Sequence, residues 1–105
     1  MGAGSVRLTI VTGSFSADHQ KPYGDHRHGH DWHVQAELPA GEHKDAPQGR
    51  LDALLAELDH AFLDDLMDDP SNEGVAEWLG VQLAAAAVAV WRYDRGRKFG
   101  GVWRA

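Results

Sequence analysis

The chain has 105 residues, a formal net charge of −6 and no cysteine. This length fits one domain, residues 1–105, with a single modest core. The acidic balance disfavours nucleic acid and an anionic membrane surface as partners, because both attract basic faces. The lack of cysteine excludes disulfides and agrees with a cytoplasmic location. No apolar run reaches the length of a membrane span, and the first five residues lack the pattern of a signal peptide.

Apolar residues that alternate with polar ones predict two strands early in the chain. One strand covers residues 6–11 and extends toward residue 15, and the other covers residues 28–38. Between them, residues 20–25 are polar and contain Gly and Pro, which predicts a loop. The two strands are expected to pair in an antiparallel way.

The middle of the chain predicts two helices. Residues 39–49 are rich in Pro, Gly and charge, and they predict a long turn. Apolar residues at helical spacing from Leu51 to Phe62 predict the first helix, which the Asp-Asp-Pro segment at 68–70 ends. Ser71 then predicts the N-cap of a second helix.

The last part of the chain completes a sheet. Val88 and Val90 begin a third strand, Gly96 predicts a turn, and residues 99–103 predict a fourth strand. The order β-β-α-α-β-β predicts an α+β fold, with an antiparallel four-stranded sheet and both helices on one face. Because the other face and the edges stay uncovered, we expect several copies to assemble into an oligomeric barrel.

Histidines are the strongest functional signal of the sequence. His28 and His30 are two residues apart on a predicted strand, so their side chains share a face, and Gly29 leaves room between them. Antiparallel pairing could bring His19, which follows the first strand, to the same place. Three histidines with an open fourth position are typical of a catalytic zinc site. His26 shares the parity of His28 and is either a fourth ligand or a loop residue.

The remaining histidines are assigned differently. His33 is expected on the opposite face of its strand, and His43 is expected to be exposed in the long turn. Asp59 and His60 form an acid–base pair in which the carboxylate would orient the imidazole. Neighbours on one helix do not face each other, so direct pairing requires a local turn there. The alternative, which the two residues alone favour, is a solvated helix end.

Five segments, in the same order, resemble the family of 6-pyruvoyl-tetrahydropterin and 6-carboxy-tetrahydropterin synthases, which belongs to the tunnelling-fold (T-fold) superfamily. Together they span nearly the whole chain. The segments are Phe-Ser-Ala-Asp-His at 15–19, His-Gly-His at 28–30, the glycine and Asp within 49–55, Leu-Asp-His-Ala-Phe-Leu-Asp at 58–64 and Pro-Ser-Asn-Glu at 70–73.

The resemblance implies a zinc enzyme that acts on dihydroneopterin triphosphate by general acid–base chemistry. Members of this family form trimers, often stacked as hexamers, with each site at a subunit interface. Zinc is held by the histidines that match His19, His28 and His30. The Asp and His that match Asp59 and His60 transfer protons together with a cysteine, and a glutamate after the third strand anchors the pterin ring.

The chain departs from the family at the cysteine. That residue lies four positions before His-Gly-His, where this chain has Gly24, and the chain contains no cysteine. A thiolate base is therefore excluded. Asp25 or His26 is expected to replace it, because either side chain can accept a proton near neutral pH.

A second departure is Arg92, which occupies the position of the pterin-anchoring glutamate. A pterin edge presents N–H donors, and arginine offers only donors, so the usual pose would leave buried groups unpaired at a cost on the order of several kcal/mol. Arg92 would suit a carboxylate or phosphate instead. Asp94 or Glu73 could serve as the anchor, with Ser71 also near the substrate, or Arg92 could simply form a salt bridge with Asp94.

Taken together, these residues predict a zinc-dependent homo-oligomer that catalyses a lyase, isomerase or cyclase type of proton transfer. Its substrate would be a small polar molecule that need not be a pterin. One alternative is a tetrahydropterin synthase whose base and anchor have moved to Asp25 and Asp94. The other is a non-catalytic protein that binds a metal or a ligand.

Overall fold

The computed structural model describes residues 5–22, 26–43 and 45–105. Within them the chain is α+β and follows the predicted order β-β-α-α-β-β. The elements are β1 (Leu8–His19), β2 (His28–Pro39), α1 (Asp45–Leu58), the short 3-10 helix η1 (Leu63–Asp65), α2 (Asn72–Leu83), β3 (Ala87–Asp94) and β4 (Arg97–Arg104).

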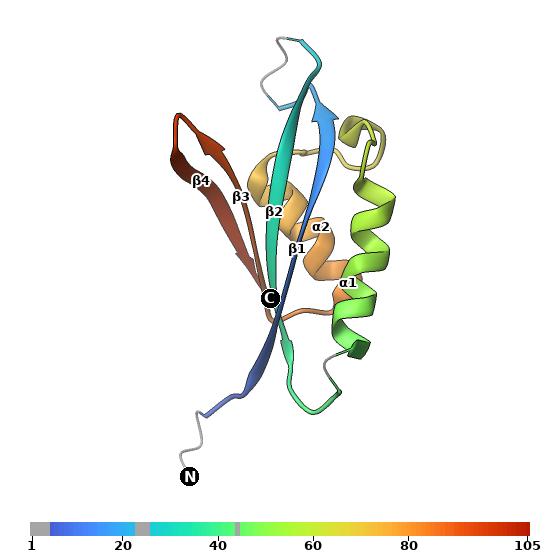
Figure 1. Cartoon of the computed structure of the whole chain (residues 1–105), viewed down its shortest axis with the longest axis vertical. Coiled ribbons are helices and arrows are strands. Elements are labelled where there is room, and N and C mark those ends of the chain that lie inside the picture. The colour runs from blue at the N-terminus through green and yellow to red at the C-terminus, as the bar shows by residue number, and fades with distance from the viewer. Residues whose placement is uncertain (1–4, 23–25, 44) are drawn as a thin grey trace.

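The described strands form one antiparallel sheet in the order β1-β2-β3-β4. β1 and β2 pair along their whole length, from Leu8 opposite Pro39 to His19 opposite His28. β3 pairs only with the part of β2 from His33 to Glu37. One end of the β1–β2 hairpin therefore continues past β3, and the molecule is elongated, 51 × 26 × 24 Å (Figure 1).

Both helices lie on the same face of the sheet and enclose the core with it. α1 packs on β1, and α2 packs on β3 and β4 (Figure 1). Alternate residues of each strand turn inward, because side chains of a strand alternate between its faces. The buried core includes Val11, Phe15, Trp32, Val34, Leu38, Leu51, Leu55, Leu58, Val75, Leu79, Val88 and Val90.

The first helix differs from its prediction at both ends. It begins at Asp45, inside the segment predicted as a turn over 39–49. Pro47 is compatible with this start, because the first turn of a helix leaves its N–H groups unpaired. The helix ends at Leu58, before Phe62, because His60 adopts a left-handed φ of 61° and donates its backbone N–H to the carbonyl of Ser16 on β1.

The second half of the chain follows the prediction closely. Ser71 caps α2, and its hydroxyl accepts a hydrogen bond from the Gly74 N–H at 3.0 Å. Gly96, with a φ of 78°, makes the turn between β3 and β4. α2 ends at Leu83, because Ala84 adopts the left-handed conformation.

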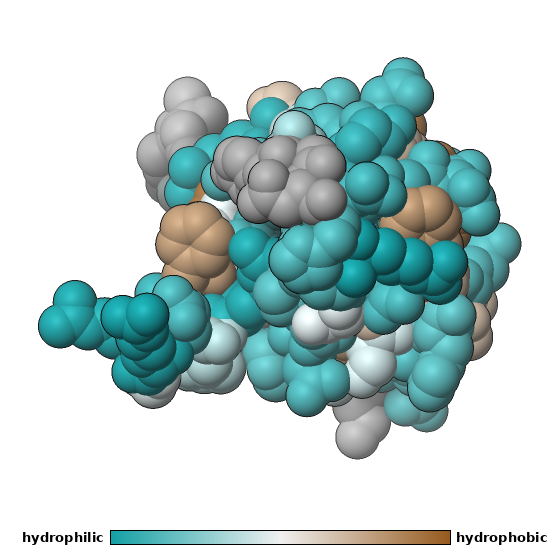
Figure 2. Space-filling view, turned by 90° about the horizontal axis from the view of Figure 1, so that it is seen from above, coloured by the Kyte–Doolittle hydropathy of each residue, from teal (hydrophilic) through white to brown (hydrophobic). Residues whose placement is uncertain are grey.

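Among the described residues, no element covers the face of the sheet opposite the helices. Its exposed apolar side chains include Ile10, Tyr93 and Val102, which are 57%, 61% and 51% exposed. The surface at the hairpin end is mostly hydrophilic, with a few separate hydrophobic residues (Figure 2). Neither α1 nor α2 combines the length and the apolar character that a membrane-crossing helix requires.

We predict that Gly80→Ala destabilises the fold by about 1–3 kcal/mol, because an added Cβ would overlap the Trp103 ring that packs α2 on β4. Gly49→Ala is the matched control. Nothing lies within 4 Å of a Cβ at this position of α1, so the substitution should stabilise by about 0.5–1 kcal/mol. Urea unfolding measures both. Equal effects of the two substitutions would contradict the packing of Trp103 on Gly80.

Candidate metal centre

Three histidines converge at the hairpin end of the sheet. His19 is the last residue of β1 and lies opposite His28 on β2, and Ala17 lies opposite His30. The Nε2 atoms of His28 and His30 are each 3.1 Å from Nε2 of His19. The three side chains can therefore each offer one nitrogen to a single metal ion. The register of the hairpin produces the cluster that the sequence predicted.

Hydrogen bonds at the outer nitrogens orient two of these rings. Nδ1 of His19 lies 2.9 Å from the carbonyl oxygen of Pro70, and Nδ1 of His28 lies 2.9 Å from that of His26. A carbonyl oxygen only accepts, so each Nδ1 must carry the proton. In the neutral rings both Nε2 lone pairs then point at each other. A cation bound between the two Nε2 atoms would accept both lone pairs. A hydrogen bond from the other ring nitrogen to a backbone carbonyl is typical of metal-bound histidine.

Burial lowers the pKa of two of the three imidazoles, those of His19 and His30. Burial and then the positive charge of Arg92 lower the pKa of His30 to about 4. Burial also lowers the pKa of His19, which is only 2% exposed, although its hydrogen bond to Pro70 opposes the shift. Neutral imidazole is the form that binds a metal. Three nitrogens with no cysteine fit zinc with an open fourth position.

Arg92 also belongs to this centre. It lies on β3 with the inward parity of Val90, and its Nη1 is 3.3 Å from Nε2 of His19. Its guanidinium stands over the rings of Trp32 and Phe99, with Cζ 4.9 and 5.7 Å from the two centroids. Arg92, which the sequence analysis predicted to contact the substrate, thus lies beside the predicted metal ligands.

The other predicted substrate residues lie elsewhere. Asp94 is exposed at the end of β3. Ser71 uses its hydroxyl to cap α2. Glu73 is exposed and lies against β4, where a Cβ on Gly101 would come within 2.6 Å of its Cγ. None of these three has a described contact with the histidine cluster.

Asp59 and His60 form the predicted pair. Nδ1 of His60 lies 2.8 Å from Oδ2 of Asp59, and Oδ1 of Asp59 accepts the backbone N–H of Ser16 at 2.9 Å. That N–H, followed by His60, lowers the pKa of Asp59. The left-handed backbone of His60 supplies the local turn that the pairing of neighbours requires. The carboxylate therefore fixes the orientation of an exposed imidazole.

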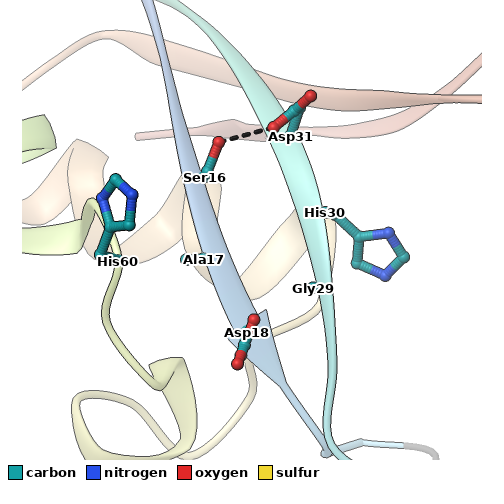
Figure 3. Close-up of a pocket in the computed structure, with 7 residues that line it drawn as sticks. All are labelled: Ser16, Ala17, Asp18, Gly29, His30, Asp31 and His60. Carbon is teal, nitrogen blue, oxygen red and sulfur yellow. Dashed lines mark hydrogen bonds between the residues drawn. The ribbon is translucent and has the colours of Figure 1, made fainter.

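His60 faces an open cleft of about 400 Å³ on the side of the hairpin away from the helices. Ser16, Asp18 and Asp31 line this cleft, and Ser16 donates a hydrogen bond of 2.6 Å to Asp31. Figure 3 shows the His30 ring turned away from these side chains. Within one chain, His30 and His60 both line this cleft, but the His30 ring points away from His60 (Figure 3).

The residues predicted to replace the cysteine are only partly placed. Gly24 and Asp25 lie outside the described residues. His26 is exposed, with its ring centroid 5.5 Å from that of His28, and its carbonyl orients His28. The predictions for two other histidines are confirmed. The ring of His33 stacks on that of Trp91 on the opposite face of the sheet, with the two centroids 5.8 Å apart, and His43 is exposed.

Some residues around the centre were not anticipated. The carboxylate of Asp18 pairs with Arg27 at 2.9 Å and lies across Gly29, where a Cβ would come within 2.6 Å of its oxygen. The lack of a side chain at Gly29 therefore leaves room for the Asp18 carboxylate. Asp64 accepts backbone hydrogen bonds from Gln20 and Lys21, which fix the turn after His19. The parity of β1 and β2 could have revealed Asp18, but Asp64 carries no such signal.

No family model matches this chain, and no curated protein matches it.

We predict that the metal-free protein loses stability as the pH falls from about 6.5 to about 4. In that window the unfolded chain takes up a proton at residue 30 and the folded protein does not, so protonation favours unfolding. His30→Gln should reduce this dependence. Urea unfolding in the presence of a chelator, at pH 7.5 and at pH 5, measures it. An identical loss in the wild type and in His30→Gln would contradict the prediction.

Proposed function

We propose that this chain is a zinc-dependent enzyme that resembles the 6-pyruvoyl-tetrahydropterin and 6-carboxy-tetrahydropterin synthases. It would catalyse a lyase, isomerase or cyclase type of proton transfer on a small polar substrate, in the cytoplasm. The observation that carries the proposal is the convergence of three Nε2 atoms, two of them 3.1 Å from the third, with their outer nitrogens bonded to carbonyls. Zinc bound there would polarise a substrate oxygen and so acidify the adjacent C–H.

The proton is received by His60 in this proposal. Its Nδ1 is held by Asp59, so Nε2 is the atom left to accept a proton from carbon. The low pKa of Asp59, caused mainly by the Ser16 N–H, keeps this carboxylate ionised to stabilise the imidazolium that forms. Asp25 or His26, just before His28 in the sequence, would take the second proton-transfer role in place of the absent thiol.

The two halves of this machinery face away from each other within one chain. The rings of His19, His28 and His30 have the inward parity of Trp32, whereas His60 opens into the cleft that Ser16 and Asp31 line together with His30. A productive site would therefore combine the cluster of one subunit with the Asp59–His60 pair of another. The uncovered face of the sheet and its exposed Ile10 and Val102 also favour a homo-oligomer, a trimer or a hexamer.

We predict that the purified protein binds about one zinc ion per chain and that His28→Ala weakens this binding by about 100-fold or more. His43→Ala is the matched control, because it removes an exposed histidine remote from the cluster. Metal analysis and titration against a chromogenic chelator measure both. Wild-type protein that binds no zinc, or His28→Ala with unchanged affinity, would refute the proposed metal centre.

We predict that His60→Ala keeps its zinc but loses about 100-fold to 10,000-fold in turnover, because the proton acceptor is gone. Dihydroneopterin triphosphate and small hydroxycarbonyl compounds are the substrates to assay. Turnover of the pterin by the wild type would favour a tetrahydropterin synthase with a relocated base and anchor.

Mixing His60→Ala with His28→Ala subunits tests the shared site directly. Each variant alone is expected to be inactive, but a mixed oligomer contains sites with an intact cluster from one chain and an intact Asp59–His60 pair from another. Partial recovery of turnover is expected after the two variants are refolded together. If recovery is absent although mixed oligomers form, each site draws on a single chain.

One rival function is favoured by a specific contact. The Arg92 guanidinium, 3.3 Å from Nε2 of His19, could satisfy that nitrogen without a metal. Under this alternative the chain binds a ligand and catalyses nothing, and His60→Ala changes no activity. Zinc binding together with the loss of turnover in His60→Ala distinguishes the two functions.

A further inference from the structure

A groove with an apolar floor and an acidic rim runs along α2, and its volume is about 380 Å³. Its lining includes three apolar side chains and three carboxylates, namely Met67, Trp78 and Val81, and Asp68, Asp69 and Glu77. None of these carboxylates forms an ion pair with a described residue. Residues 51–91 contain nine Asp and Glu but no Lys or Arg. A cation for the rim must therefore come from a distant part of the chain or from another molecule.

The walls of the groove are held in place by the start of α2. A Cβ at Gly74 would overlap the carbonyl oxygen of Asp69, so the segment before α2 lies directly against the helix. The carboxylate of Asp69 also accepts the backbone N–H of Ser71 at 3.3 Å. A groove that is formed in advance loses less conformational entropy when a partner enters it.

A surface that matches the groove lies at the tip of the β3–β4 hairpin, residues 93–98. This tip carries three of the ten Lys and Arg residues of the chain and one carboxylate, namely Arg95, Arg97 and Lys98, and Asp94. All four side chains are exposed, and none forms an ion pair with a described residue. Arginine suits an aromatic floor beside carboxylates, because its guanidinium stacks on rings and donates to two carboxylate oxygens at once.

The turn at the tip contains an unusual residue. Arg95 and Gly96 connect the paired strands, with φ angles of 53° and 78°. A two-residue turn with two positive φ angles favours Asn-Gly, Asp-Gly or Gly-Gly. Arginine in this left-handed conformation costs stability, and such strain is typical of positions with a function. The backbone thus indicates that the charge of Arg95 is used.

The tip and the groove are apart within one chain. Asn72, the first residue of α2, donates its side-chain amide to the carbonyl of Phe99 on β4 at 3.5 Å. The tip lies beyond this contact, whereas the groove follows α2 from Gly74 toward Gln82. Figure 1 shows the tip standing away from both helices. The groove is therefore out of reach of the tip of its own chain.

We propose that the β3–β4 tip of one chain docks into the α2 groove of a second copy. Arg95 and Arg97 would lie over Trp78 and between the carboxylates of the rim. Every chain offers one tip and one groove, so this contact is of the heterologous kind that builds rings or filaments. It lies away from the histidine cluster and does not depend on the proposed function.

The lack of cysteine allows a direct test of this contact. Val81→Cys places a thiol in the groove, and Tyr93→Cys places one at the tip. Under mild oxidation, these two proteins should form a mixed disulfide at least about tenfold faster than Val81→Cys with Val102→Cys, because docking raises the effective concentration of the thiols. Val102 is the matched control, since it is 51% exposed on β4 and Tyr93 is 61% exposed on β3. Equal rates overturn the proposal and leave the groove to a different partner.

Charge reversals in the same cross-linking pair test the complementarity. Glu77→Lys in the groove protein should slow the reaction by about tenfold, whereas Glu57→Lys, on an exposed part of α1, should leave it unchanged. Arg97→Glu in the tip protein should slow it as well, but Arg97→Glu with Glu77→Lys should react faster than either reversal alone. If the combined reversals show no such recovery, the proposed pairing of charges is wrong.

Arg95→Asn separates association from folding. Asparagine favours the turn, so the Tm should rise by a few degrees, while the loss of charge should slow cross-linking by about fivefold or more. Arg104→Asn removes the same charge at the other end of β4 and should change neither quantity. An unchanged cross-linking rate in Arg95→Asn overturns the role of the tip.

Discussion

The pairing register of β1 and β2 is the constraint on which the rest of the site depends. It sets His19 opposite His28 and Ala17 opposite His30, so that all three imidazoles emerge on the helix side of the sheet. A slip of one residue would turn the β2 histidines to the other face. Trp32 opposes such a slip, because it is fully buried and donates its indole N–H to the carbonyl of Ala17 at 3.1 Å.

Trp32 also connects the hydrophobic core to the histidine cluster. Its ring stacks on Phe15 at 5.9 Å, meets the edges of His19 and His30, and supports the guanidinium of Arg92. The centre is therefore built on a rigid apolar base, with the carbonyl of Pro70 closing it from the chain before α2. Such support holds donor atoms in place before a ligand arrives, and preorganisation of this kind is what metal binding and catalysis require.

The free edge of β1 determines where the acid–base pair lies. Asp59 and His60 leave the helix because the backbone of Ser16 bonds to both of them, and the chain then continues beside β1 as far as Phe62. The same edge thus ends α1, bends the backbone at His60 and fixes Asp59. As a consequence, His60 points away from the ring of His30 in its own chain, which is the physical basis for proposing shared sites.

The sequence by itself determined the order of the elements, the N-cap at Ser71 and the cluster of His19, His28 and His30, because alternation, capping and parity are local properties that act over a few residues. It misplaced both ends of α1, and it could not show the contact of Arg92 with His19 or the hydrogen bonds of Asp64 to the turn after His19. Those features depend on the free edge of β1, on the offset of β3 along the hairpin and on side chains reaching across strands. Only the tertiary structure decided them, because each joins residues that are distant in the chain.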